Sequence, residues 1–84
     1  MNAVATAAKK MTNDECAAGM QELFNKMRRG VKDVMISDAG KIMIFCKSEL
    51  SAMSVKIDML RIGRKNVKIT VPNPYTDGCY LVEC

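Results

Sequence analysis

The chain has 84 residues, a formal net charge of +4 and no histidine. A chain of this length forms one small domain, which buries roughly 60–65% of the surface that its unfolded state exposes. With 49% hydrophobic and 26% charged residues, its composition is that of an ordinary globular chain and gives little support to a disordered one. No run approaches the roughly eighteen apolar residues of a membrane span, and the order of a signal peptide is absent. We expect one domain over residues 1–84 in the cytoplasm, with no membrane partner.

The first predicted element is a helix over residues 13–29, preceded by an alanine-rich segment, residues 1–10, that we expect to be a flexible tail. Thr12 and Glu15 have the spacing of a capping box at the start of this helix. Gly30 can adopt the left-handed conformation that ends it. One apolar stripe recurs at helical spacing and consists of Cys16, Met20, Leu23, Phe24 and Met27.

The centre of the predicted sheet is the run Lys41–Lys47, in which five consecutive apolar residues stand between two lysines. Side chains alternate across a strand, so this strand is apolar on both faces and belongs in the middle of a sheet. Residues 31–37 also have strand character, and Asp38–Gly40 is a turn that joins the two strands as a hairpin. The predicted helix covers one face, and what covers the other face is left open.

Residues 48–62 fit two structures. As a helix, the segment begins at a Ser48 cap and carries one apolar stripe from Leu50 to Leu60, but a second stripe then lies on its far side. As a strand, residues 53–59 alternate between apolar and polar side chains without error. We favour the strand and keep the helix as the alternative.

Two more strands are predicted near the end of the chain, over residues 67–71 and 79–83. Pro72 and Pro74 end the first of them, and the loop that follows has Tyr75 at its tip. The sequence therefore predicts an α+β fold, in which an N-terminal helix packs on a four- to five-stranded antiparallel meander. A second helix at 48–62 is the alternative.

Enzyme signatures are missing from this chain, and its carboxylates are scattered over turns and predicted outer faces. Without histidine, the commonest general base and metal ligand is absent, and neither a glycine-rich phosphate loop nor a nucleophile elbow is found. The four cysteines are Cys16, Cys46, Cys79 and Cys84, whose spacing is poor for zinc. We favour free thiols over disulfides and expect no catalytic residue, metal or cofactor.

Basic residues form two groups along the chain. The first closes the predicted helix, and the second surrounds the turn before the strand at 67–71. If the fold joined them, they would form a patch able to bind several phosphates, although ordinary solvent-exposed charge explains them at least as well. The members of this candidate patch are Arg28, Arg29, Lys32, Arg61, Arg64, Lys65 and Lys68.

The apolar residues include eight methionines, and the strand interpretation of 53–59 leaves one face of the sheet uncovered. Exposed apolar patches of more than a few hundred Å² usually mark an interface, so this interpretation implies a homodimer or a protein target. The alternative is that residues 48–62 form a helix that closes the core internally. In its small size and its lack of a catalytic apparatus, the chain looks like the inhibitors and regulators that phages and mobile elements encode, including anti-CRISPR proteins. Our first hypothesis is a non-enzymatic module that occludes a larger protein or ribonucleoprotein, with Tyr75 as a contact. The alternative is a small basic nucleic-acid-binding protein.

Overall fold

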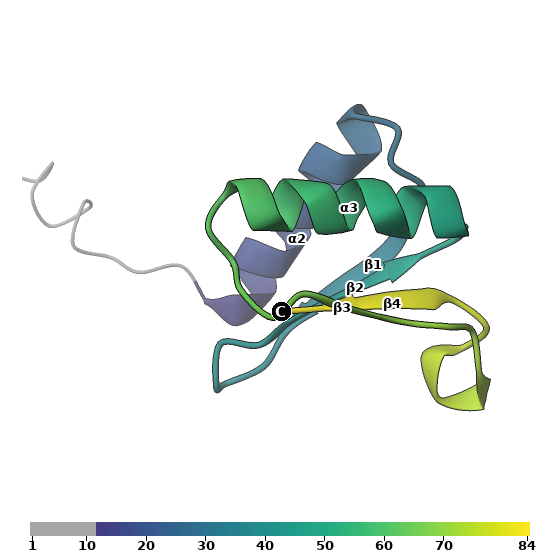
Figure 1. The fold of residues 1–84 in the computed structure, drawn as a ribbon. Coiled ribbons are helices and arrows are strands. Elements are labelled where there is room, and N and C mark those ends of the chain that lie inside the picture. Colours follow the sequence, from purple (N-terminus) through teal and green to yellow (C-terminus); the bar gives the residue numbers. More distant parts are fainter. Residues whose placement is uncertain (1–11) are drawn as a thin grey trace, which may run out of the picture.

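The computed structural model describes residues 12–84, and it forms two layers: a four-stranded sheet and two helices (Figure 1). The predicted tail at residues 1–10 lies outside the described residues. In chain order the elements are α2 (Asn13–Lys26), β1 (Val31–Ile36), β2 (Ile42–Cys46), α3 (Glu49–Arg61), β3 (Lys68–Thr70), the 3-10 turn η1 (Pro74–Thr76) and β4 (Tyr80–Glu83). This arrangement confirms the predicted α+β fold.

The order of the strands across the sheet is β1-β2-β4-β3, and each neighbouring pair is antiparallel. β2 and β3 therefore run parallel to each other, with β4 between them and α3 as the connection that crosses over. The predicted meander is wrong, because the last strand lies between β2 and β3 instead of at the edge. β3 forms an edge of the sheet, and Pro72, which has no backbone N–H to donate, follows soon after it.

The preferred strand at residues 53–59 is also wrong, because this segment belongs to helix α3 and the alternative is correct. The Ser48 hydroxyl accepts a hydrogen bond from the Ser51 amide at 3.2 Å and so caps the first turn. Ala52, Val55 and Met59 then recur at helical spacing, and all three are buried against the sheet.

Both helices cover the same face of the sheet (Figure 1). Ile44 at the centre of β2 and Val82 at the centre of β4 are fully buried under them. The core combines Ala17 and Phe24 of α2 with the buried side of α3 and with the inward-facing residues of the strands. No helix of the described residues covers the opposite face, which we call the open face of the sheet.

The capping box at Thr12 is confirmed, since its hydroxyl accepts from the Glu15 amide while the Glu15 carboxylate accepts from the Thr12 amide. The helix ends earlier than predicted, at Lys26 instead of residue 29. Arg28 occupies the left-handed position after the cap, with φ of 56°, where glycine is the usual residue. Gly30 has a different role, because a Cβ on it would lie 2.6 Å from the Ser51 hydroxyl oxygen of α3.

The two helix ends allow a direct comparison of the same motif with and without glycine. After α3 the equivalent position is Gly63, with φ of 96°, and both ends close with the same pair of backbone hydrogen bonds. We expect Arg28→Gly to raise the free energy of unfolding by about 0.5–1 kcal/mol, because it relieves the left-handed strain of a non-glycine residue. Gly63→Ala should lower it by about 1 kcal/mol. Urea unfolding followed by circular dichroism measures both, and a destabilised Arg28→Gly variant would contradict the expectation.

Candidate functional site

The open face of the sheet carries two rows of side chains fixed by the strand register. One row is Asp33, Phe45, Leu81 and Thr70, and the other is Met35, Met43, Glu83 and Lys68. In the first row the two central residues are apolar and the residues on the edge strands are polar. In the second row the residues on β1 and β2 are methionines and those on β4 and β3 are charged. The open face is thus a methionine-rich apolar strip with polar borders, a composition that suits an adaptable binding surface.

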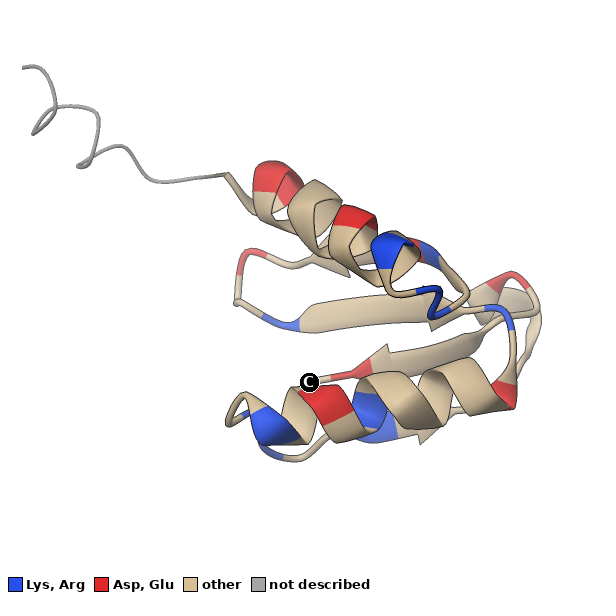
Figure 2. Cartoon of the chain, turned by 90° about the horizontal axis from the view of Figure 1, so that it is seen from above, with Lys and Arg blue, Asp and Glu red and all other residues tan. Residues whose placement is uncertain are grey.

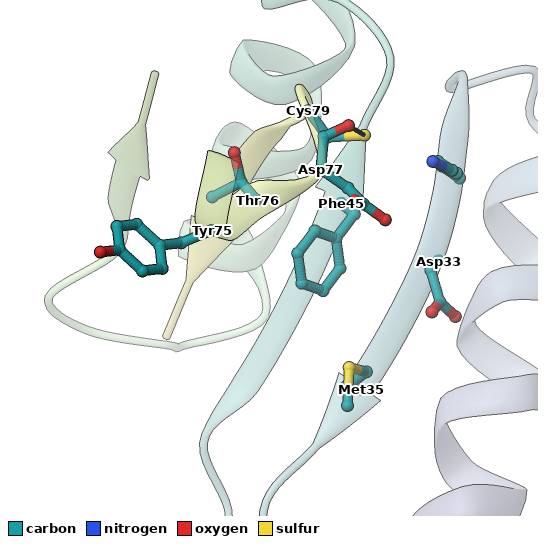
Figure 3. A pocket seen from close by; sticks show the side chains of 8 residues that line it. Asp33, Met35, Phe45, Tyr75, Thr76, Asp77 and Cys79 are labelled. Carbon is teal, nitrogen blue, oxygen red and sulfur yellow. Dashed lines mark hydrogen bonds between the residues drawn. The ribbon is translucent and has the colours of Figure 1, made fainter. Parts of the chain in front are cut away.

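A pocket of about 200 Å³ lies at one end of this strip, where the loop after β3 approaches β1. Figure 3 shows Phe45 at its centre, with Met35 and Asp33 of β1 on one side and residues of the loop on the other. The loop contributes Thr76, Asp77 and Cys79, and the ring of Tyr75 extends away from Phe45 (Figure 3).

The loop that holds Tyr75 is fixed by hydrogen bonds among its own residues. The Asn73 side chain accepts from the Tyr75 amide at 2.8 Å, and the buried Thr76 hydroxyl accepts from the Asn73 amide at 3.0 Å. Pro74 occupies the first position of η1, where its fixed backbone angle suits the turn. Tyr75 is 97% exposed at this site. Its side chain therefore contributes little to folding, although its position is firmly held.

Two of the seven predicted basic residues are engaged in intramolecular contacts. The Arg29 guanidinium lies 2.8 Å from the Asp58 carboxylate and also donates to the Ser54 hydroxyl, which joins the end of α2 to α3. The Arg64 guanidinium donates to the backbone carbonyls of Gly40 and Cys84, which ties the β1–β2 turn to the end of β4. Each of these two arginines therefore connects segments of the chain that are distant in sequence.

The other basic residues do not form one patch. Figure 2 shows basic segments at the end of α2 and, separately, at the end of α3. Arg28 and Lys32 belong to the group near the end of α2. Lys32 also lines the pocket around Phe45, which we call the Phe45 pocket. Lys65 and Lys68 line a second pocket of about 350 Å³ at the other end of the sheet. The fold therefore separates the two groups that the sequence analysis considered together.

The pocket lined by Lys65 and Lys68, which we call the Lys65 pocket, also has a basic lining residue that the sequence analysis did not assign to the candidate patch. Lys41, from the turn between β1 and β2, also lines this pocket, and its ammonium lies 2.6 Å from the Glu83 carboxylate. Glu83 offsets part of the positive charge there. Arg61, the remaining member of the predicted patch, is exposed in the last turn of α3 and lies beside an apolar groove between the helices.

The groove between α2 and α3 has a volume of about 420 Å³ and is lined almost entirely by apolar side chains. Leu23 and Met27 from α2 and Ile62 from the end of α3 are exposed along it. The sequence analysis assigned Leu23 and Met27 to the same apolar stripe as the buried Phe24, because spacing alone cannot distinguish a buried residue from one at the rim of a groove.

The cysteines are unpaired, and the described residues contain no cluster of three potential metal ligands. Cys46 and Cys79 are buried, whereas Cys16 and Cys84 are partly exposed. Burial raises the pKa of the Cys46 thiol from 9.0 to about 11, and the nearby Cys79 adds to the effect. Cys46 is therefore a protonated core residue at neutral pH and a poor nucleophile.

No family model matches the chain, and no match is found among curated proteins or solved structures. Within residues 12–84, neither helix has the length and apolar character needed to span a bilayer. The function must therefore be argued from the surfaces described above.

The Arg29 and Asp58 side chains are only 20% exposed, so their ion pair is expected to stabilise the fold measurably. A double-mutant cycle with Arg29→Met and Asp58→Ala should give a coupling energy of about 1 kcal/mol in urea unfolding. Arg28→Met is the matched control, because Arg28 is exposed, and it should change stability by less than about 0.5 kcal/mol. A coupling energy near zero would show that the Arg29 contact is not structural.

Cys46 should make the stability of the protein depend on alkaline pH. Because the folded state raises the pKa of this thiol from 9.0 to about 11, its contribution is complete below pH 9.0 and is lost as the pH rises through that interval. Between pH 8 and pH 10 the wild type should lose about 1 kcal/mol more than Cys46→Ala, as measured by urea unfolding. Equal losses in both proteins would contradict the raised pKa.

Proposed function

We propose that this protein is a non-enzymatic binding module that acts by occluding a larger protein or ribonucleoprotein. The observation that carries the proposal is Tyr75, which is 97% exposed at the tip of a loop that Asn73 and Thr76 hold in place. An exposed tyrosine on an ordered loop loses little conformational entropy when it binds, and tyrosine is among the residues that dominate binding energy at interfaces.

The surface beside Tyr75 supports the same proposal. The loop that presents Tyr75 also forms one wall of the Phe45 pocket, so the tyrosine adjoins the apolar strip of the open face. Met35, which is 49% exposed, lies in the same strip. An aromatic anchor next to an apolar centre with polar borders is the composition of a typical protein interface.

Binding by addition of a strand to the sheet is less favourable than binding through a face. On the edge strand β1, the Lys32 carbonyl accepts from the Gln21 side chain at 2.8 Å, and the Val34 amide donates to the Asp33 carboxylate at 2.9 Å. The other edge, β3, has only three residues. Both edges are thus protected against pairing with another chain.

We extend the proposal to the kind of small inhibitor that phages and mobile elements encode, on the basis of size and of the missing histidine. We also place the protein in the cytoplasm, which suits four unpaired cysteines because thiols stay reduced there. These two extensions rest on the size and composition of the chain and not on a binding site.

Nucleic-acid binding is the second candidate, and the Lys65 pocket favours it. Three lysines, Lys41, Lys65 and Lys68, converge there and could contact phosphates. Charge reversal of Lys65 and Lys68 should abolish oligonucleotide binding in fluorescence anisotropy if this function holds. Unchanged anisotropy for single-stranded and duplex oligonucleotides at low salt would exclude it.

Tyr75 can be tested by replacing it with a photo-crosslinking phenylalanine analogue and irradiating the protein in a lysate of its source organism. We expect one discrete crosslinked protein at position 75 and none when the analogue replaces Lys26, which is exposed on α2. Tyr75→Ala should weaken binding to the captured protein at least tenfold without changing stability. A captured protein that binds Tyr75→Ala as tightly as the wild type would contradict the role of Tyr75.

A further inference from the structure

Helix α3 is apolar on the side that faces away from the core. Leu50 is 80% exposed, Met53 is 49% exposed, and Ile57 and Leu60 are each 50% exposed. The helix buries Ala52, Val55 and Met59 on its opposite side, so these four residues lie outside the hydrophobic core. We call them the α3 seam.

The spacing of the α3 seam is that of a helix-pairing surface. Leu50, Met53, Ile57 and Leu60 follow one another at intervals of three, four and three residues. This is the a/d pattern of a coiled coil, in which a narrow apolar stripe inserts into the same stripe of a second helix. From Leu50 to Leu60 the seam runs along about 15 Å of helix. A single exposed apolar residue needs no explanation, but four exposed apolar residues in this pattern do.

The charges beside the seam decide which helix fits it. Glu49 and Lys56 precede Leu50 and Ile57 in the heptad, so they border the same side of the seam. Neither has an ion-pair partner among the described residues. In an antiparallel pair of identical helices, residues at this heptad position face each other. Glu49 of each copy then approaches Lys56 of the other, which gives two symmetric ion pairs.

A parallel pair would bring unfavourable contacts instead. Arg61 borders the other side of the seam, and a parallel arrangement places it beside the partner's Lys56. In the antiparallel arrangement Arg61 faces the partner's Ser54, which is uncharged. The two Lys56 side chains come close at the two-fold axis, but each has the partner's Glu49 as a counter-ion. The flanking residues therefore select the antiparallel pair.

We propose that the α3 seam binds the same seam of a second copy, so that the protein forms a two-fold symmetric dimer through antiparallel α3 helices. Leu50 packs against the partner's Leu60, and Met53 packs against the partner's Ile57. Such an interface is self-complementary, as two-fold symmetry requires. This proposal is independent of the Tyr75 surface, because the seam and the open face lie on opposite sides of the sheet.

Sedimentation equilibrium of the full chain over micromolar to millimolar concentrations tests the proposal. The wild type should show a concentration-dependent mass that approaches twice the 9.3 kDa of one chain. Ile57→Lys, at the centre of the seam, should weaken the dimer at least tenfold. Leu23→Lys is the matched control, because Leu23 is 55% exposed on α2 outside the seam, and it should leave dimerisation unchanged.

A charge exchange tests the antiparallel geometry and separates it from unspecific apolar association. Lys56→Glu should weaken the dimer a few-fold, because it places acidic residues opposite each other across the axis. The double variant Glu49→Lys, Lys56→Glu should restore the dimer, since it exchanges the two partners. Circular dichroism of every variant confirms that α3 remains folded.

Each outcome of these measurements decides the proposal. A wild type that stays monomeric up to millimolar concentration would overturn it, as would a dimer that Ile57→Lys does not weaken. A dimer lost equally in Leu23→Lys would assign self-association to the groove between the helices instead of the seam. Failure of the charge exchange to restore the dimer would overturn the antiparallel geometry. None of these results depends on whether Tyr75 binds a target.

Discussion

The structure depends on a central strand that is apolar on both faces while helices cover only one of them. Ile44 and Cys46 of β2 are fully buried under α2 and α3, whereas Met43 and Phe45 point to the open face. In a two-layer fold this arrangement stabilises the domain from one side only. The apolar residues on the other side must be explained by something other than internal packing. The same reasoning applies to α3, which is apolar toward the sheet and away from it.

Two of the positively charged side chains stabilise the fold through intramolecular contacts. Arg29 and Arg64 each join segments distant in sequence, the first through Asp58 and the second through backbone carbonyls of Gly40 and Cys84. A guanidinium can donate several hydrogen bonds in a fixed plane, and a lysine cannot replace it in such a role. The lysines of the predicted patch are exposed in two separate places, Lys32 at one end of the sheet and Lys65 and Lys68 at the other. A modest net charge distributed in this way favours solubility over a continuous phosphate-binding surface.

Local signals in the sequence predicted local structure well. The capping box at Thr12, the hairpin around Asp38–Gly40 and the exposed loop at Tyr75 all depend on a few neighbouring residues. The strand order could not be predicted, because it depends on α3 carrying the chain across the sheet.

The error in the secondary structure predicted for residues 53–59 has a specific cause. Two apolar stripes, one buried and one exposed, interleave in α3, and together they imitate the alternation of a strand. The segment that misled the secondary-structure prediction is thus the segment with apolar residues in excess of what the core requires. The Phe45 pocket and the separation of the two basic groups also arise from tertiary packing and leave no local signal.

The two proposed surfaces are compatible because the sheet stands between them. A dimer joined through the α3 seam would have its open faces directed outward on opposite sides, each with its own Tyr75. Such a dimer could engage two copies of a target, or two sites on one assembly, and the second contact would then be intramolecular. Because effective concentrations of linked sites reach the millimolar range, a weak seam and a moderate contact at Tyr75 would together give tight occlusion. Under these two proposals, the apolar residues on the two outer surfaces of so small a domain would have separate uses, since one surface would bind the second copy and the other would bind the target.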